Sequence, residues 1–204
     1  MKEVTIIDYG MGNLGSISNM LRVLGFNPII SHDTNVIQNS KYLILPGVGK
    51  FDAAVKNLKE RNLFDLLKKL SKINDIHILG ICLGMQLMCR KSEEGILEGL
   101  GIFNAEVKDF SLNIDSTFKI PHMGWNFVKK RNDLDFLKNL ENPRFYFVHS
   151  YFVESQNKED ILFKSDYGIE FISGMQNNNN IGVQFHPEKS HKFGKEFFRS
   201  FLAD

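Results

Sequence analysis

The stretch Ile76-His-Ile-Leu-Gly80-Ile-Cys82-Leu-Gly84 decides the fold. Its first six residues, 76–81, form an apolar run typical of a buried strand, and a helical pattern follows over Gly84–Arg90. The glycines two positions before and two positions after Cys82 leave room for a sharp, strained turn. Such a turn holds its central side chain at the carboxyl edge of a sheet, so the stretch predicts a strand, a nucleophile-bearing turn and a helix.

Strand and helix patterns alternate through the first half of the chain. Apolar runs predict strands over Val4–Asp8, Phe26–Ile30 and Tyr42–Leu45, and helical spacing predicts helices ending at Leu24 and spanning Phe51–Leu70. This order predicts a parallel sheet covered by helices on both faces.

Strand patterns dominate the second half, where Ser190–Ala203 is the one long helical pattern. The expected strands are Gly101–Phe110, Trp125–Lys130, Arg144–Val153, Ile161–Lys164, Phe171–Met175 and Ile181–Phe185. The run Asn177–Asn180 predicts the tip of a hairpin. We therefore expect one α/β domain over residues 1–204, with an open mixed, mostly parallel sheet and helices on both faces.

Composition and charge narrow the classes of function. The 204 residues carry 25 Lys and Arg against 24 Asp and Glu, so no single-sign field indicates nucleic acid or an anionic membrane. The longest nearly apolar stretch, Ile76–Cys89, is shorter than the roughly 20 residues of a membrane helix. Acidic residues within the first apolar run argue against a targeting segment, and we expect a cytoplasmic protein. The spacing of His and Cys predicts no metal site.

A second motif supplies a base and a residue to orient it. Gln184-Phe-His186-Pro-Glu188 ends the last predicted strand and precedes the last helix. The extended backbone favoured around Pro187 lets His186 and Glu188 project to the same side, beside Cys82 at the edge of a parallel sheet. The pattern predicts a Cys-His-Glu triad, although Cys82 as a small buried hydrophobe remains open. Cys89, inside the helix, is expected to be a core residue.

Backbone donors for an oxyanion are expected from two places. Pro46-Gly47-Val48-Gly49 follows another strand, and a glycine-rich loop there can turn its peptide N–H groups toward developing charge. The N–H of Leu83 is expected to be the partner donor.

One motif favours a different class of protein. Gly10-Met-Gly12-Asn-Leu-Gly15 follows the first strand, opens a helix and has Asp33 about 20 residues later, as in dinucleotide-binding loops. This alternative makes no use of Cys82 or His186 and leaves little chain for a substrate domain. A tight turn at the start of a helix is the simpler interpretation.

Together, these motifs resemble the class I, or triad, glutamine amidotransferases, a family with a flavodoxin-like fold. The resemblance rests on Gly80-Ile-Cys-Leu-Gly-Met-Gln-Leu87 and Gly182-Val-Gln-Phe-His-Pro-Glu-Lys-Ser190. Within the family, the chain is similar to glutaminase subunits of imidazole glycerol phosphate synthases. The motifs of that branch are Ile7-Asp-Tyr-Gly-Met-Gly-Asn-Leu14, Leu45-Pro-Gly-Val-Gly49, Pro121-His-Met-Gly-Trp-Asn126 and Phe145-Tyr-Phe-Val-His-Ser-Tyr151.

The resemblance implies a role for each matching residue. Cys82 is the nucleophile, His186 the acid and base, and Glu188 the residue that orients it. Gly47, Val48 and Gly49 match a strand whose peptide reorients to complete the oxyanion hole with Leu83. The implied glutamine-binding residues are Gln86, Glu94, Ser150 and Tyr151. The implied contacts with a synthase subunit are Asn13, Trp125, Asn126, Tyr146 and Lys189, and Gly15 departs from an Arg that many relatives carry there.

The resemblance also implies an activity and a partner. The chain would hydrolyse glutamine without a cofactor and pass ammonia to a (β/α)8-barrel cyclase subunit, as a heterodimer. That cyclase would make imidazole glycerol phosphate and aminoimidazole carboxamide ribotide in histidine biosynthesis. Three alternatives stay open: a triad glutaminase that feeds another synthase, such as one modifying a surface sugar; a Cys-His-Glu hydrolase without ammonia transfer; and a dinucleotide-binding module.

Overall fold

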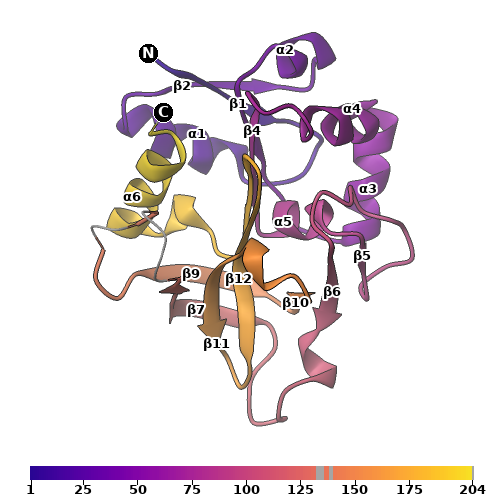
Figure 1. Cartoon of the computed structure of the whole chain (residues 1–204), viewed down its shortest axis with the longest axis vertical. Coiled ribbons are helices and arrows are strands. Elements are labelled where there is room, and N and C mark those ends of the chain that lie inside the picture. The colour runs from indigo at the N-terminus through magenta and orange to yellow at the C-terminus, as the bar shows by residue number, and fades with distance from the viewer. Residues whose placement is uncertain (132–135, 138–139, 204) are drawn as a thin grey trace.

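An eleven-stranded mixed sheet forms the centre of the computed structural model, which describes residues 1–131, 136–137 and 140–203 (Figure 1). Five parallel strands make one half, in the order β2 (Asn27–Ser31), β1 (Glu3–Ile7), β3 (Tyr42–Leu45), β4 (His77–Ile81) and β13 (Asn180–Val183). Buried β-branched and leucine side chains dominate β1, β3 and β4, because both faces of these central strands are covered. The α/β class and the mixed sheet with helices on both faces are confirmed.

The other half of the sheet is largely antiparallel. It continues from β13 through β12 (Glu170–Asn177), β10 (Tyr151–Ser155), β6 (Ala105–Asp109) and the short β5 (Lys91–Ser92), while β11 (Ile161–Asp166) and β8 (Lys129–Lys130) branch from β12. Asn177 pairs with Asn180 across the β12–β13 turn, and Asn178 has φ 51°, which asparagine tolerates. The predicted hairpin tip is therefore confirmed.

A separate two-stranded sheet pairs β7 (His122–Phe127) with β9 (Arg144–His149). The prediction of one strand over Arg144–Val153 is wrong, because the chain leaves this small sheet at Ser150 and joins the large sheet as β10. The carbonyl of Ser150 accepts a hydrogen bond from the Phe110 N–H (3.1 Å), which fixes the crossover between the sheets.

Alternate residues of the parallel strands face opposite helical layers. Ile6, Ile44 and Leu79 share a cluster with α1 (Leu14–Val23) and α6 (His191–Phe201). Ile7 and Leu45 share the other cluster with α2 (Thr34–Gln38), α3 (Phe51–Glu60), α4 (Leu63–Leu70) and α5 (Leu83–Met88). Figure 1 shows α1 and α6 on one side of the parallel strands and α3 to α5 on the other. The remaining short elements are the 3₁₀ turns η1 (Phe110–Leu112), η2 (Lys158–Asp160) and η3 (Pro187–Lys189).

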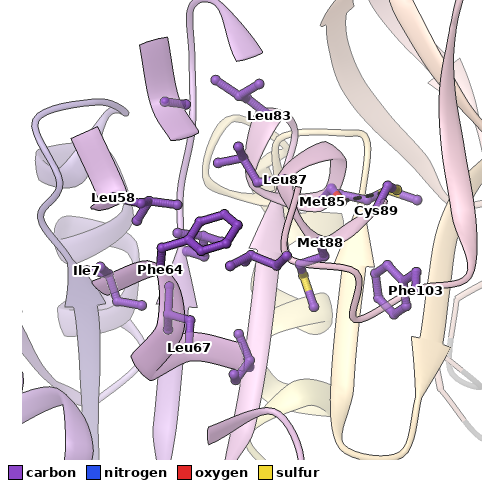
Figure 2. Packing of buried hydrophobic residues seen from close by; sticks show 14 of the residues in the cluster. Ile7, Leu58, Phe64, Leu67, Leu83, Met85, Leu87, Met88, Cys89 and Phe103 are labelled. Carbon is purple, nitrogen blue, oxygen red and sulfur yellow. Dashed lines mark hydrogen bonds between the residues drawn. The ribbon is translucent and has the colours of Figure 1, made fainter. Parts of the chain in front are cut away.

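The helix predicted over Phe51–Leu70 is two helices, α3 and α4. The break falls at Asn62, whose φ of 58° lies in the left-handed region that asparagine tolerates better than most residues. After the change of direction, Leu63 and Leu67 belong to the same buried cluster as Leu58. Figure 2 shows Leu58, Phe64 and Leu67 in this cluster. Helical spacing alone does not reveal such a break, because the apolar pattern continues through it.

The start of α5 lies directly against the end of β3. A Cβ built on Gly84 would collide with the carbonyl oxygen of Leu45, and one on Gly80 would meet Gly84 and Met88. Glycine at both positions is therefore required by close approach of the backbone, as expected for small residues around the turn at Cys82.

We predict that Gly84→Ala lowers the free energy of unfolding by about 2 kcal/mol, because the new methyl group forces α5 away from Leu45. Gly15→Ala is the matched control, since nothing lies within 4 Å of its position in α1. We expect this control to keep or raise stability, because alanine favours helix more than glycine does. Urea unfolding measures both, and equal effects of the two substitutions would contradict the close-approach argument.

Candidate active site

Cys82 occupies a strained turn between β4 and α5. Its backbone has φ 55° and ψ −110°, a region that costs a residue with a side chain about 1–3 kcal/mol. Its N–H donates to the Val183 carbonyl (2.8 Å), so the neighbouring strand β13 helps to hold the turn. The expected strained turn is present, and it presents the thiol at the carboxyl end of the parallel strands.

The structure brings His186 and Glu188 together beside this thiol. Nδ1 of His186 donates to Oε1 of Glu188 at 2.7 Å, and both side chains are almost wholly buried. Nε2 of His186 is also buried and has no partner in regular hydrogen-bond geometry among the described residues. Cys82 is close enough to this imidazole to raise its pKa. The arrangement leaves one ring nitrogen free to exchange a proton near the thiol.

Backbone contacts fix the position of His186. Its N–H donates to the Tyr146 carbonyl (2.9 Å), and its carbonyl accepts from the Ser190 hydroxyl (2.6 Å). The same hydroxyl accepts from the Tyr146 N–H (3.0 Å). Strand β9 and the turn η3 are thereby tied together around the histidine, which limits its rotation.

The charge state of His186 follows from its neighbours. Burial alone lowers its pKa, but hydrogen bonding and charge from Cys82 and Glu188 outweigh burial and raise the pKa to about 10. These two neighbours therefore favour the protonated form of the His186 imidazole.

A cavity of about 400 Å³ opens over Cys82. Its lining comes from loops, from helix α5 and from strands β9 and β10. It includes eight residues expected from the sequence: Val48, Gly49, Cys82, Leu83, Gln86, Glu94, Ser150 and Tyr151. Gly47 lies beneath it, against Leu83 and the Tyr9 hydroxyl. His186 and Glu188 do not line the cavity and stand behind the thiol, where the bulk solvent does not reach them.

The Glu94 carboxylate faces this cavity from the loop after β5. It accepts a hydrogen bond from the Phe51 N–H (2.9 Å) at the start of α3. Burial raises the pKa of this carboxyl, with the Phe51 N–H acting in the opposite direction. Asp52 holds the following residues by accepting from the N–H groups of Ile96 and Leu97. The carboxylate is thus a fixed acceptor at one wall of the cavity.

Sequence reasoning missed several residues of the site. Pro121, Val148 and His149 also line the cavity, and Gln184 points its amide nitrogen at the Cys82 sulfur (3.7 Å). All four lie within or beside motifs that carried the resemblance, but a sequence does not show which side of a strand faces a cavity formed by other segments.

Two neighbouring histidines of this region are held neutral. Burial lowers the pKa of His122 to about 4. Burial, together with the nearby His122, lowers the pKa of His149 to about 3, although the Tyr151 carbonyl opposes that shift.

The residues expected to contact a synthase subunit fall into two groups. Trp125 is 45% exposed and stacks on His191, while Lys189 lies over the ring of Tyr146, which pairs with Trp125 across the small sheet. These side chains form one surface. By contrast, the Asn126 amide bonds inside the protein to the Asp166 carbonyl (2.7 Å) and to His122 (3.2 Å).

Residues of the glycine-rich loop 10–15, and Asp33 after it, cap helices and pack against other segments. Asn13 caps α1 by accepting from the Ser16 N–H (3.2 Å), and Asp33 caps α2 through the Asn35 N–H (2.8 Å). A Cβ on Gly12 would touch Pro46, so the loop lies against the segment that leads to the cavity. Asp33 is already engaged by its own helix.

The chain and its fold match a known family. Residues 5–204 match the family model "Glutamine amidotransferase class-I". A solved structure described as a glutamine amidotransferase superposes with a TM-score of 0.76 at 16% identity, covering 98% of this chain and 97% of that one. The chain belongs to the class-I glutamine amidotransferase family.

Sequence relatives narrow the branch. "Imidazole glycerol phosphate synthase subunit HisH 2" of Methanococcus maripaludis is 51% identical over 98% of both chains. The HisH subunit of Leptospira borgpetersenii is 41% identical over 98% of this chain and 99% of its own. Within the family, the chain groups with the HisH subunits.

No helix in the described ranges is long and apolar enough to cross a membrane. The described residues also contain no group of three or more His, Cys, Asp or Glu placed to hold a metal ion.

We predict that one of the two cysteines reacts with iodoacetamide in the folded protein. Cys82 faces the cavity, whereas Cys89 is wholly buried beside Met85 (Figure 2). Burial strongly raises the pKa of the Cys89 thiol. Mass spectrometry should find a single adduct, lost in Cys82→Ala and kept in Cys89→Ala. An adduct that survives in Cys82→Ala would contradict this assignment.

We predict a loss of stability on acidification from the buried histidines. The folded-state pKa of His122 lies below the ordinary value near 6.5, so the unfolded chain binds more protons from about pH 6.5 down to about 4. The stability that depends on a neutral His122 is fully present above that range. It is lost as the pH decreases through the range. Urea unfolding measures the free energy of unfolding, which should decrease between pH 7 and pH 5. The decrease should be smaller in His122→Phe than in the wild type, by about 1 kcal/mol. The exposed His32→Gln control should follow the wild type, and a His122→Phe profile identical to wild type would count against a neutral His122.

Proposed function

We propose that the chain, as one glutamine amidotransferase domain over residues 1–204, is the glutaminase subunit of an imidazole glycerol phosphate synthase. The observation that carries the proposal is the strained Cys82 turn beside the buried His186–Glu188 pair, at the floor of a cavity. Relatives named HisH, matched over nearly their full length, support the particular synthase.

In the first step, the Cys82 thiolate attacks the side-chain carboxamide carbon of glutamine. The carbonyl oxygen becomes an oxyanion, for which the N–H of Leu83 and a peptide of the Gly47–Gly49 segment are the donors. The N–H of Leu83 suits this role because the first N–H groups of a helix have no partner within it. Protonated His186 then gives its proton to the departing nitrogen, the carbon–nitrogen bond breaks, and ammonia leaves behind a thioester.

In the second step, water attacks the thioester carbon. His186, now neutral, takes a proton from that water, the carbon–sulfur bond breaks, and glutamate is released with the thiolate restored. Glu188 keeps Nδ1 of His186 protonated throughout and stabilises the imidazolium, so that Nε2 is the nitrogen that carries the transferred proton.

The walls of the cavity suit the amino-acid end of glutamine. Glu94 offers a carboxylate for the α-ammonium group, and Gln86, Ser150 and Tyr151 offer polar groups beside it. The cavity of about 400 Å³ is in the size range of small-molecule sites.

A partner subunit would receive the ammonia. We propose a (β/α)8-barrel cyclase that docks on the surface of Trp125, Tyr146 and Lys189. Met123, Trp125 and Phe127 on the outer face of β7 are 61%, 45% and 55% exposed, and such an apolar strip is typical of an interface. Ammonia is reactive only while unprotonated, so a direct passage between the subunits protects it from bulk water.

The test is glutamate release from glutamine by the purified chain, alone and with the cyclase subunit and its ribonucleotide substrate. We expect low activity alone and stimulation of at least about 100-fold by the loaded partner. Cys82→Ala should abolish release, and Glu188→Gln should lower kcat by about 10²-fold or more, because the imidazolium loses its stabilising charge.

Cys89→Ala is the matched control and should retain activity, since that thiol does not reach the cavity. Full turnover by the isolated chain would instead indicate a free-standing hydrolase. Silence with this cyclase would indicate another synthase as partner.

A further inference from the structure

The inner face of β7 carries an unassigned pair of buried histidines. His122 on β7 pairs in register with His149 on β9, and their rings meet with Nδ1 of His122 at 2.9 Å from Nε2 of His149. Nδ1 of His149 is hydrogen-bonded to the Tyr151 carbonyl (2.7 Å). On the other side, Nε2 of His122 meets the Asn126 amide nitrogen (3.2 Å).

The direction of every hydrogen bond in this series follows from the groups at its two ends. A carbonyl only accepts, so Nδ1 of His149 carries a proton and its Nε2 accepts from Nδ1 of His122. Nε2 of His122 must then accept from the Asn126 amide. The Asn126 orientation agrees independently, because its oxygen accepts from the Phe127 N–H (2.7 Å) and its nitrogen donates to the Asp166 carbonyl (2.7 Å).

An added proton would break this series of hydrogen bonds. On His122 it would place an N–H against the amide hydrogens of Asn126, and on His149 it would place one against a donor of His122. The surroundings are aromatic: His122 stacks on Tyr167 (centroids 4.1 Å apart) and Phe147 (4.9 Å). The pair is thus neutral and fully satisfied, a condition in which a buried polar network rigidifies its neighbourhood.

The series of hydrogen bonds from His122 through His149 ends at the wall of the glutamine cavity. The Tyr151 carbonyl accepts from His149 and also from the Gln86 amide (3.2 Å). Gln86 donates in turn to Gln184 (3.1 Å), whose amide nitrogen faces the Cys82 sulfur. His122 itself does not line the cavity.

We propose that His122 is a positioning residue for glutamine, which acts through His149 to hold the Ser150–Tyr151 wall of the cavity. This inference rests on the proposed glutaminase function. Since β9 leaves its sheet at Ser150, the two flanking strands do not fix this wall by pairing with each other. The hydrogen bond from His149 to the Tyr151 carbonyl spans the break, and His122 sets the ring of His149 for it.

The experiment uses three substitutions of His122 in the complex with the cyclase subunit and its ribonucleotide. His122→Phe keeps the aromatic stacking and removes the hydrogen bonds. His122→Gln stays polar, but its amide nitrogen extends to the Nε2 position and does not donate to His149. His122→Asn places an amide nitrogen near the Nδ1 position and can donate to His149. His77→Phe is the control, because His77 stacks on Tyr42 at the opposite end of β4.

We expect His122→Phe and His122→Gln to raise the KM for glutamine about tenfold, as the loss of one buried hydrogen bond would. Their kcat should stay within about twofold, because Cys82 and His186 are untouched. His122→Asn should return KM to within about threefold of the wild type, and His77→Phe should match the wild type. A merely structural role would lower stability without this split between KM and kcat.

Equal KM values for His122→Gln and His122→Asn would overturn the proposal, and this comparison decides even where His122→Phe fails to fold. Wild-type KM in all three variants would overturn it as well. Failure of the proposed function is a separate result, since the wild-type complex itself would then release no glutamate.

Discussion

The contact between Gly84 and the Leu45 carbonyl is the constraint on which the site depends. It brings the start of α5 against the end of β3, and the chain reaches that position through the strained backbone of Cys82. The same approach places the N–H of Leu83 next to the segment that follows β3. The Cys82 thiol, the N–H of Leu83 and the Gly47–Gly49 segment are therefore positioned by a single packing requirement, and the surrounding core offsets the cost of the strain.

Much of this arrangement could be predicted from the sequence because its causes are local. The glycines around Cys82, the hairpin at Asn177–Asn180 and the alternation of strands and helices each leave a pattern within a few residues. The breaks at Asn62 and Ser150 could not be predicted in this way. An apolar pattern runs through both, and tertiary packing decides that the chain turns there.

The polar interior of the site shows the same limit. Gln184 and His149 sit in motifs that pointed to the family, yet their partners come from distant parts of the chain. Burying two neutral histidines and two glutamines is tolerable because the hydrogen bonds described above pair them with one another and with the backbone. Whether a buried polar residue is paired is a property of the folded structure, which no residue pattern contains.

The proposed activity requires that glutamine be cleaved through a covalent bond to Cys82. The most direct measurement is mass spectrometry of the complex, mixed with glutamine and quenched in acid during turnover, followed by peptide mapping. We expect a mass increase of one glutamyl group on the peptide that contains Cys82. Turnover with no adduct on that peptide, or with the adduct on another residue, would contradict it.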